Sequence, residues 1–395
     1  MTSFSIRLIF SLLLFSVAFL FQPLKADELK GKNSYMAMVD IGSSGSRLYL
    51  YKFQVYDKCK PPLLTEIMLK NNTVAPGLYT LAGDTQKVTE YFEPIFNSLD
   101  AAMKEHNIQY KEVEFYGLGT AGMRILSPFD RIALFKSLND LCATKGFSKV
   151  NVRVLEGHEE GLYDWITVNY LEGTLANDKE TYCILDLGGG SAEIAYEVPD
   201  AIYPDTFKVT MAGKTFNVYS KSYLGLGMDF VRYQISQLPY CWQTGYPMPS
   251  DDQPAHANFF KGVDDLSILI TLANRSGSFL APDIPPDMQI IGLGGFYYLT
   301  KSKPLNLPKD YCINDIVGSG NKLSKESWIS LLQNYKLGPY TFEYLFESEY
   351  IAALLKNGFH FSNSRIIHAR NRINEMDSDW TLGAALYVYE GNETN

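Results

Sequence analysis

The chain has 395 residues, of which 46% are hydrophobic and 20% are charged. This composition excludes a disordered chain, a collagen-like chain and a polytopic membrane protein. Lysine and arginine total 35 against 44 aspartates and glutamates, which gives a net charge of -9, and we therefore expect no nucleic-acid partner. The length suits two to three domains, or one fold split into two lobes around a cleft.

Residues 1–26 have the pattern of a secretory signal peptide. Arg7 precedes the apolar run Leu8–Phe21, which is short for a bilayer span, and the small residue Ala26 follows before Asp27. The alternative is a retained anchor helix. No later segment approaches a membrane span, so we expect a secreted or periplasmic protein without a stable span after cleavage.

The strand-like Tyr35–Tyr51 and the later Tyr182–Tyr196 resemble each other. Each pattern predicts a buried strand that ends in aspartate, Asp40 or Asp186, then a Gly/Ser turn with positive φ, then the returning strand of a hairpin. Such a turn directs backbone N–H groups and hydroxyls at one point, and it binds an anion without lysine or arginine. A single copy is more typical of an ordinary hairpin or flexible linker, but two copies indicate duplicated halves that face each other across a cleft.

The two aspartates provide hard oxygen ligands for a divalent cation that accompanies phosphate. Mg²⁺ keeps most of its waters, so Asp40 and Asp186 are expected to contact Mg²⁺ or Ca²⁺ through water. A third glycine-rich turn, Gly117–Arg124, follows a predicted strand and precedes a predicted helix. It either presents Thr120 to the same cleft or is an ordinary strand-to-helix turn.

The segment Glu156–Gly161 follows a predicted strand and precedes the mostly buried helix LYDWITVNYL. Glu160 lies near the N-terminus of this helix, where the helix dipole favours an ionised carboxylate that can accept a proton from water. The alternative is a solvated glutamate in the first turn of the helix.

Five cysteines follow the predicted signal peptide, and none forms a C-x-x-C pair, so the spacing does not predict a zinc site. Cys183 opens an apolar run and is expected in the core. The remaining four allow at most two disulfides, and we expect one between Cys241 and Cys312 in an oxidising compartment.

Taken in order, these motifs resemble the ecto-apyrase family, the nucleoside triphosphate diphosphohydrolases. The resemblance covers about Val39 to Val388 and runs through DIGSSGSRLYLYKF, GTAGMRIL, EGHEEGLYDWITVNYL, ILDLGGGSAEIAY, SYLGLGMDFVR, GLGGFYYL and DWTLGAALYV. It implies an α/β fold with two ribonuclease-H-like lobes of the actin, sugar-kinase and heat-shock ATPase superfamily, with the active site in the cleft between the lobes. It also implies hydrolysis of nucleoside tri- and diphosphates to monophosphate and phosphate, dependent on Mg²⁺ or Ca²⁺.

The resemblance implies roles for individual residues as well. Glu160 matches the catalytic base, and Ser191 matches a residue that helps to hold the attacking water. Asp40 and Asp186 match residues that organise the water shell of the metal, and Tyr350 is similar to the aromatic position that stacks on the base. The positions that match phosphate-binding residues are Ser43, Ser44, Gly45, Thr120, Gly188, Gly189 and Gly190.

One departure from the family pattern is Glu193, because the family usually has Ser-Thr-Gln where this chain has Ser191-Ala192-Glu193. The form GGGSAEI is closer to exopolyphosphatases and guanosine-pentaphosphate phosphatases. A glutamine amide both donates and accepts hydrogen bonds, whereas an ionised glutamate only accepts them. Glu193 is therefore either a second catalytic group that orients water or a ligand in a more metal-rich site.

We predict that residues 27–160 and 366–395 form the first lobe and that residues 161–365 form the second. The expected mechanism is direct attack of water, activated by Glu160, on the terminal phosphorus of a nucleotide. Three alternatives stay open: an exopolyphosphatase or guanosine-pentaphosphate phosphatase, a sugar kinase, and a secreted nucleotide-binding protein without turnover. The sequence does not predict base preference or oligomeric state.

Overall fold

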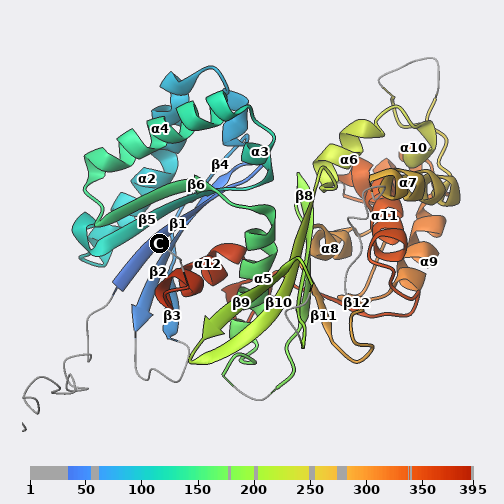
Figure 1. The fold of residues 1–395 in the computed structure, drawn as a ribbon. Coiled ribbons are helices and arrows are strands. Elements are labelled where there is room, and N and C mark those ends of the chain that lie inside the picture. Colours follow the sequence, from blue (N-terminus) through green and yellow to red (C-terminus); the bar gives the residue numbers. More distant parts are fainter. Residues whose placement is uncertain are drawn as a thin grey trace, which may run out of the picture.

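The computed structural model describes residues 34–54, 62–176, 179–199, 203–248, 254–273, 283–336, 338 and 340–392. The predicted signal peptide at residues 1–26 and Cys59 lie outside these ranges. Two β-sheets form the centres of two lobes, and two helices lie between the sheets (Figure 1).

The first sheet has the strand order β3-β2-β1-β5-β6, and β4 pairs with β2. Strands β1, β2 and β3 are antiparallel neighbours, whereas β5 and β6 continue the sheet in parallel with β1. The strands are β1 (Ser34–Ile41), β2 (Ser46–Gln54), β3 (Leu63–Ile67), β4 (Thr73–Val74), β5 (Val113–Gly119) and β6 (Lys149–Val154).

The second sheet repeats this arrangement. Its order is β12-β13-β11-β7-β8-β10-β9, in which β7 is antiparallel to β8 and parallel to β11, as β1 is to β2 and β5. Its strands are β7 (Cys183–Leu187), β8 (Ser191–Glu197), β9 (Thr206–Met211), β10 (Lys214–Leu224), β11 (Ile290–Gly292), β12 (Asp310–Tyr311) and β13 (Ile367–Ala369). The two hairpins that the sequence predicted are thus the corresponding elements of two similar sheets.

Helices cover both faces of each sheet. The α-helices are α2 (Val88–Glu105), α3 (Ala121–Arg124), α4 (Pro128–Lys145), α5 (Gly157–Leu171), α6 (Met228–Gln234), α7 (Phe259–Ala273), α8 (Gly295–Tyr298), α9 (Ile313–Leu323), α10 (Trp328–Asn334), α11 (Tyr344–Ala353) and α12 (Trp380–Tyr389). The short 3₁₀ helices are η1 (Leu78–Leu81), η2 (Thr85–Lys87), η3 (Tyr110–Glu112), η4 (Pro239–Cys241), η6 (Leu299–Lys301) and η7 (Thr341–Glu343), and a π-helical turn, η8 (Leu354–Gly358), extends α11. The hairpin β14 (Arg372–Ile373) and β15 (Met376–Asp377) leads into α12.

Successive side chains of β1 point to opposite faces of the sheet, so the core of the first lobe has two parts. Ala37 and Val39 pack toward α2 and α4, whereas Met36 and Met38 pack on the opposite face with α5 and α12. This period of two is the geometry of a strand buried on both faces. The same central core continues to the second sheet, so α5 and α12 join the lobes, as Figure 1 shows.

The cysteines correct one prediction. Cys183 is fully buried, as expected, but Cys241 and Cys312 are free thiols and form no disulfide with each other. Cys241 lies beside Glu349 of α11, whereas the side chain of Cys312 caps the N-terminus of α9. The two thiols therefore contact different groups, Glu349 in one case and the N-terminus of α9 in the other. Within the described residues, no helix is both long and apolar enough to cross a membrane.

Candidate active site

A cleft of about 750 Å³ separates the two lobes. Its wall includes both glycine-rich turns, the N-terminal half of α5 and the segment that leads into α12. All seven residues that were predicted to bind phosphate line this cleft: Ser43, Ser44, Gly45, Thr120, Gly188, Gly189 and Gly190. Their roles remain predictions, but the fold brings them to one place.

The two turns close the predicted hairpins, although the predicted positive φ is wrong. The N–H of Gly42 donates to the carbonyl of Gly45 at 2.8 Å, and no glycine of either turn has a positive φ. Glycine is required instead for close contact, because a Cβ on Gly45 would lie 2.5 Å from the Val74 carbonyl oxygen. A Cβ on Gly189 would lie 2.5 Å from Asp229 Oδ2.

The turns of the two lobes also contact each other. A Cβ on Gly189 would lie 2.8 Å from the hydroxyl of Ser43, and one on Gly190 would lie 2.6 Å from the Ala121 side chain. The Ser44 hydroxyl donates to Asp229 Oδ2 at 3.1 Å, across 185 positions of sequence. The groups of both halves that were predicted to bind an anion thus face a single space.

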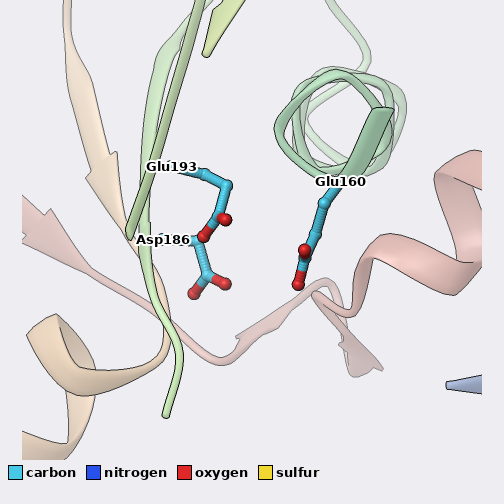
Figure 2. A group of neighbouring side chains, drawn as sticks. All are labelled: Glu160, Asp186 and Glu193. Atoms are coloured by element: carbon cyan, nitrogen blue, oxygen red, sulfur yellow. The ribbon is translucent and has the colours of Figure 1, made fainter. Parts of the chain in front are cut away.

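Three carboxylates converge beside these turns. Figure 2 shows Glu160 reaching from α5 toward Asp186 and Glu193, and each of the three offers an oxygen within 4.8 Å of the other two. Asp186 and Glu193 are paired across the β7–β8 ladder, which places their side chains on the same face of the sheet.

The N-terminus of α5 is held firmly, which fixes Glu160. Glu156 and Glu159 form a capping box, and Arg153 donates to both carboxylate oxygens of Glu159 at 2.7 Å. Such a bidentate pair holds both side chains in one geometry. The first-turn position that the sequence predicted for Glu160 is correct, but the residue is only 7% exposed rather than solvated.

Arg124 is a site residue that the sequence reasoning missed. Its Nη2 donates to Glu160 Oε2 and to Ser191 Oγ, each at 3.0 Å, and lies 3.8 Å from Glu193 Oε1. Ser222 donates to the same Glu193 oxygen at 2.6 Å. The signal was its position at the end of the GTAGMR motif, four residues after the predicted phosphate-binding Thr120.

Asp164 and Asp379 were also missed. Asp164 lies one helical turn after Glu160 and is 2% exposed, and Asp379 caps α12 while accepting from the Tyr49 hydroxyl at 2.9 Å. Both line the cleft. The i,i+4 spacing on a helix that begins at the predicted base was the usable signal for Asp164.

Burial, together with the repulsion between neighbouring carboxylates, raises the pKa of several acidic groups in the cleft. Burial raises the pKa of Glu160 well above its ordinary value, Glu193 adds to the rise and Arg124 opposes it. Burial, reinforced by Glu193, raises the pKa of Asp186 to about 7. Burial also raises the pKa of Asp40 well above its ordinary value, with Asp379 as a further cause.

The same residues fit a divalent cation. Three buried carboxylate oxygens of this site have no hydrogen-bond partner among the described residues, namely Asp40 Oδ1, Asp164 Oδ2 and Glu193 Oε2. Buried charges without partners are costly, and hard oxygen ligands suit Mg²⁺ or Ca²⁺. The donor set therefore matches the cation that was expected from the sequence.

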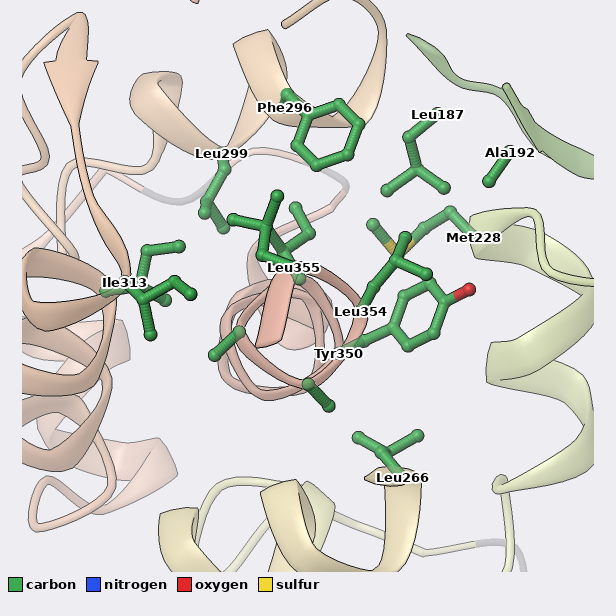
Figure 3. Close-up of a cluster of buried hydrophobic side chains, with 14 of the residues drawn as sticks. Leu187, Ala192, Met228, Leu266, Phe296, Leu299, Ile313, Tyr350, Leu354 and Leu355 are labelled. Atoms are coloured by element: carbon green, nitrogen blue, oxygen red, sulfur yellow. The ribbon is translucent and has the colours of Figure 1, made fainter. Parts of the chain in front are cut away.

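Tyr350 does not line the cleft, which corrects its prediction as the base-stacking residue. Figure 3 shows its ring inside the core of the second lobe, near Leu354 and Met228, and it is 0% exposed. Its hydroxyl donates to the carbonyl of Leu226, and its ring stacks on Phe346. A base cannot reach it in this packing. The tyrosines that do line the cleft are Tyr49, Tyr298, Tyr340 and Tyr344.

Residues 26–238 and 277–394 match the model of the GDA1/CD39 (nucleoside phosphatase) family. Ectonucleoside triphosphate diphosphohydrolase 7 of Xenopus tropicalis is 24% identical over 93% of this chain and 75% of its own length. Guanosine-diphosphatase of Schizosaccharomyces pombe is 24% identical over 91% and 74%, and ectonucleoside triphosphate diphosphohydrolase 1 of Bos taurus is 26% identical over 88% and 80%.

Solved structures confirm the expected fold. A nucleoside triphosphate hydrolase of Neospora caninum superposes with a TM-score of 0.64 at 14% identity and covers 92% of this chain and 94% of its own. The Ppx/GppA protein of Aquifex aeolicus superposes with a TM-score of 0.55 at 15% identity over 92% and 100%. The two-lobed α/β architecture of actin-like ATPases is thus the fold of this chain.

Proposed function

Because this chain belongs to the GDA1/CD39 nucleoside phosphatase family, we propose that it hydrolyses nucleoside tri- and diphosphates to the monophosphate and phosphate, with Glu160 as the base. The observation that carries this proposal is the convergence of Glu160, Asp186 and Glu193 beside two facing glycine-rich turns. Such a site is suited to hold a phosphate chain, a divalent cation and a water molecule.

The turns would bind the phosphate chain from both lobes. Backbone N–H groups and the hydroxyls of Ser43 and Thr120 would supply donors without adding positive charge, which suits an acidic cleft. The close contact at Gly189 leaves no room for a side chain, because the turn of the second lobe packs there against Asp229 and the hydroxyls of Ser43 and Ser44.

Glu160 would accept the proton of the attacking water. Burial raises the pKa of Glu160 above its ordinary value, which makes the ionised carboxylate a stronger base. Arg124 would hold Glu160 and Ser191 in one plane, since its Nη2 donates to both. Ser191 and Glu193 would then orient the water, with Ser222 fixing one oxygen of Glu193.

A divalent cation would be held by Asp40 and Asp186, through water or directly, with Glu193 close to both the cation and the water. Bound there, it would neutralise charge that develops on the phosphoryl oxygens. Asp164 interacts electrostatically with Asp186, and Asp379 with Asp40, so both are close enough for a bound cation to relieve their repulsion.

The nucleobase would occupy the aromatic end of the cleft. Tyr298 and Tyr340 are 60% and 64% exposed, and Tyr344, the first residue of α11, also lines the cleft. Exposed rings with free faces stack on a base, whereas the buried Tyr350 does not.

A phosphate-release panel tests the reaction. Wild-type protein should release phosphate from ATP, ADP, GTP and UTP with Mg²⁺ or Ca²⁺, and a chelator should abolish release. Faster release from linear polyphosphate than from any nucleotide would favour an exopolyphosphatase, the candidate that Glu193 in GGGSAEI supports. Binding of ATP without release under every condition would indicate a non-catalytic nucleotide-binding protein.

Glu160→Gln tests the assignment of the base. The amide keeps the shape and accepts a bond from Arg124, but it cannot take a proton, so we expect kcat for ATP to fall about 10²- to 10⁴-fold with KM nearly unchanged. Thermal melting checks that the variant is folded. Turnover close to wild type would assign the base elsewhere.

We also propose that the chain is exported, on the basis of the signal-like residues 1–26. Cell fractionation of the expressed full-length chain, with N-terminal sequencing of the product, tests this. A cytosolic product that retains residues 1–26 would contradict export.

A further inference from the structure

An acidic cluster lines the cleft next to the turn that contains Gly189. Asp229, Glu343 and Glu347 line this part of the cleft, and Arg232 of α6 lies against it. Arg232 donates to Asp229 Oδ1 at 3.0 Å and to Glu343. The guanidinium is therefore shared by two of the three carboxylates.

Glu347 is left without a partner of its own. Within the described residues its side chain makes no hydrogen bond or ion pair, although Arg232 is near enough to lower its pKa. Lys301 also lines the cleft, but its Nζ lies over the ring of Tyr297, 4.4 Å from the centroid. A half-buried carboxylate with unused acceptors in a cleft is available to a ligand that brings donors.

The position of Glu347 relates it to the base. Tyr344 and Glu347 lie three residues apart at the start of α11, and residues at this spacing share a helix face. Both line the cleft. A base that stacks on the ring of Tyr344 would therefore bring one of its edges toward the Glu347 carboxylate.

We propose that Glu347 is a specificity-determining residue that selects guanine over the other nucleobases; this inference rests on the proposed function. Guanine presents N1–H and the 2-amino group side by side, which match the two oxygens of one carboxylate. Adenine presents one amino group beside an acceptor nitrogen. Uracil presents one N–H between two carbonyl oxygens, which a carboxylate repels.

Burial supports the strength of this contact. Desolvation raises the pKa of Glu347 to about 7, with Asp229 as a further cause and Arg232 opposing it. The N1–H and 2-amino donors of guanine would stabilise the ionised Glu347 carboxylate, in the same way that Arg232 does. Sites that pair a buried polar group with substrate reject analogues that leave it unpaired.

Steady-state kinetics with GDP, IDP, ADP and UDP test the proposal. Inosine diphosphate is the sharpest comparison, because it differs from GDP only by the missing 2-amino group. Wild type should favour GDP over IDP by about tenfold or more in kcat/KM, mainly through KM. Glu347→Gln should remove most of this preference, whereas Glu90→Gln, an exposed change on α2, should leave it unchanged.

Binding of GMP and IMP, measured by calorimetry, provides a readout that needs no turnover. GMP should bind wild type more tightly than IMP, and Glu347→Gln should reduce this difference. Equal affinity for GMP and IMP in wild type, or an equal loss for all nucleotides in Glu347→Gln, would overturn the specificity role. Absence of phosphate release from every nucleotide would overturn the proposed reaction instead, while the GMP and IMP comparison would still test Glu347.

Discussion

At the scale of single residues, Arg124 connects groups that lie far apart in the sequence. It follows the third glycine-rich turn, and it bonds Glu160 of α5 and Ser191 of β8 while remaining close to Glu193. Its side chain is only 11% exposed, so solvent screens these pairs weakly. Removal of one partner from a buried pair leaves the other charge uncompensated.

Arg124→Met should therefore lower kcat/KM about a hundredfold and shift its pH dependence. Arg124 lowers the pKa of Glu160, so its loss raises that pKa, and the base is protonated at a higher pH. The acid limb of the kcat/KM profile for ATP should move upward in pH. Arg124→Lys keeps the charge and should move the limb less. An unmoved acid limb in folded Arg124→Met would show that Arg124 does not act on the base.

At the scale of elements, the two hairpin turns use glycine for contact rather than for backbone conformation. The turn between β7 and β8 lies against the turn between β1 and β2 and against the start of α6. Neighbouring glycines in one turn differ in this respect, because a Cβ on Gly188 would meet nothing nearer than the Ser191 carbonyl oxygen at 3.6 Å.

Gly189→Ala should impair the enzyme more than Gly188→Ala. The added methyl at Gly189 collides with Asp229 and Ser43, and relief of such overpacking costs about 1–3 kcal/mol or displaces the turn. We expect kcat/KM for ATP to fall about tenfold or more for Gly189→Ala. Kinetics of both variants, with melting temperatures, check this; equal losses would mean that the contact between the turns is unimportant.

At the scale of the whole molecule, the acidic site is assembled from both lobes and from the helix layer between them. Asp40 comes from the first sheet, Asp186 and Glu193 come from the second, and Glu160 and Asp164 come from α5. A cation bound among them would connect the lobes, and a ligand that binds the folded state alone stabilises it.

Cation removal should therefore lower the melting temperature as well as activity. At a concentration about a hundred times the dissociation constant, Mg²⁺ or Ca²⁺ should stabilise the fold by about 2.7 kcal/mol, which corresponds to several degrees. Differential scanning fluorimetry with and without chelator measures this, with KCl at matched ionic strength as the control. Identical melting curves would contradict a cation site between the lobes.

Much of the fold and part of the site follow from local patterns. Strand alternation, turn composition and the repeated aspartate predicted both hairpins, and helix spacing placed Glu160 at the start of α5. The Tyr350 prediction was wrong because a motif fixes a helix but not which of its residues face solvent. The Cys241–Cys312 prediction was wrong because the number of cysteines in a sequence does not give the distances between them in the fold.

The sequence by itself determined the repeated strand–turn–strand units and the residues at their ends, because periodicity and turn chemistry act over a few neighbouring positions. Only the tertiary structure decided that Arg124 bridges Glu160 and Ser191, that Asp164 joins the acidic site, and that Glu347 faces the cleft unpaired. These relations depend on how two sheets pack around α5 and α12. That packing is set by contacts between residues far apart in the chain, which no local pattern encodes.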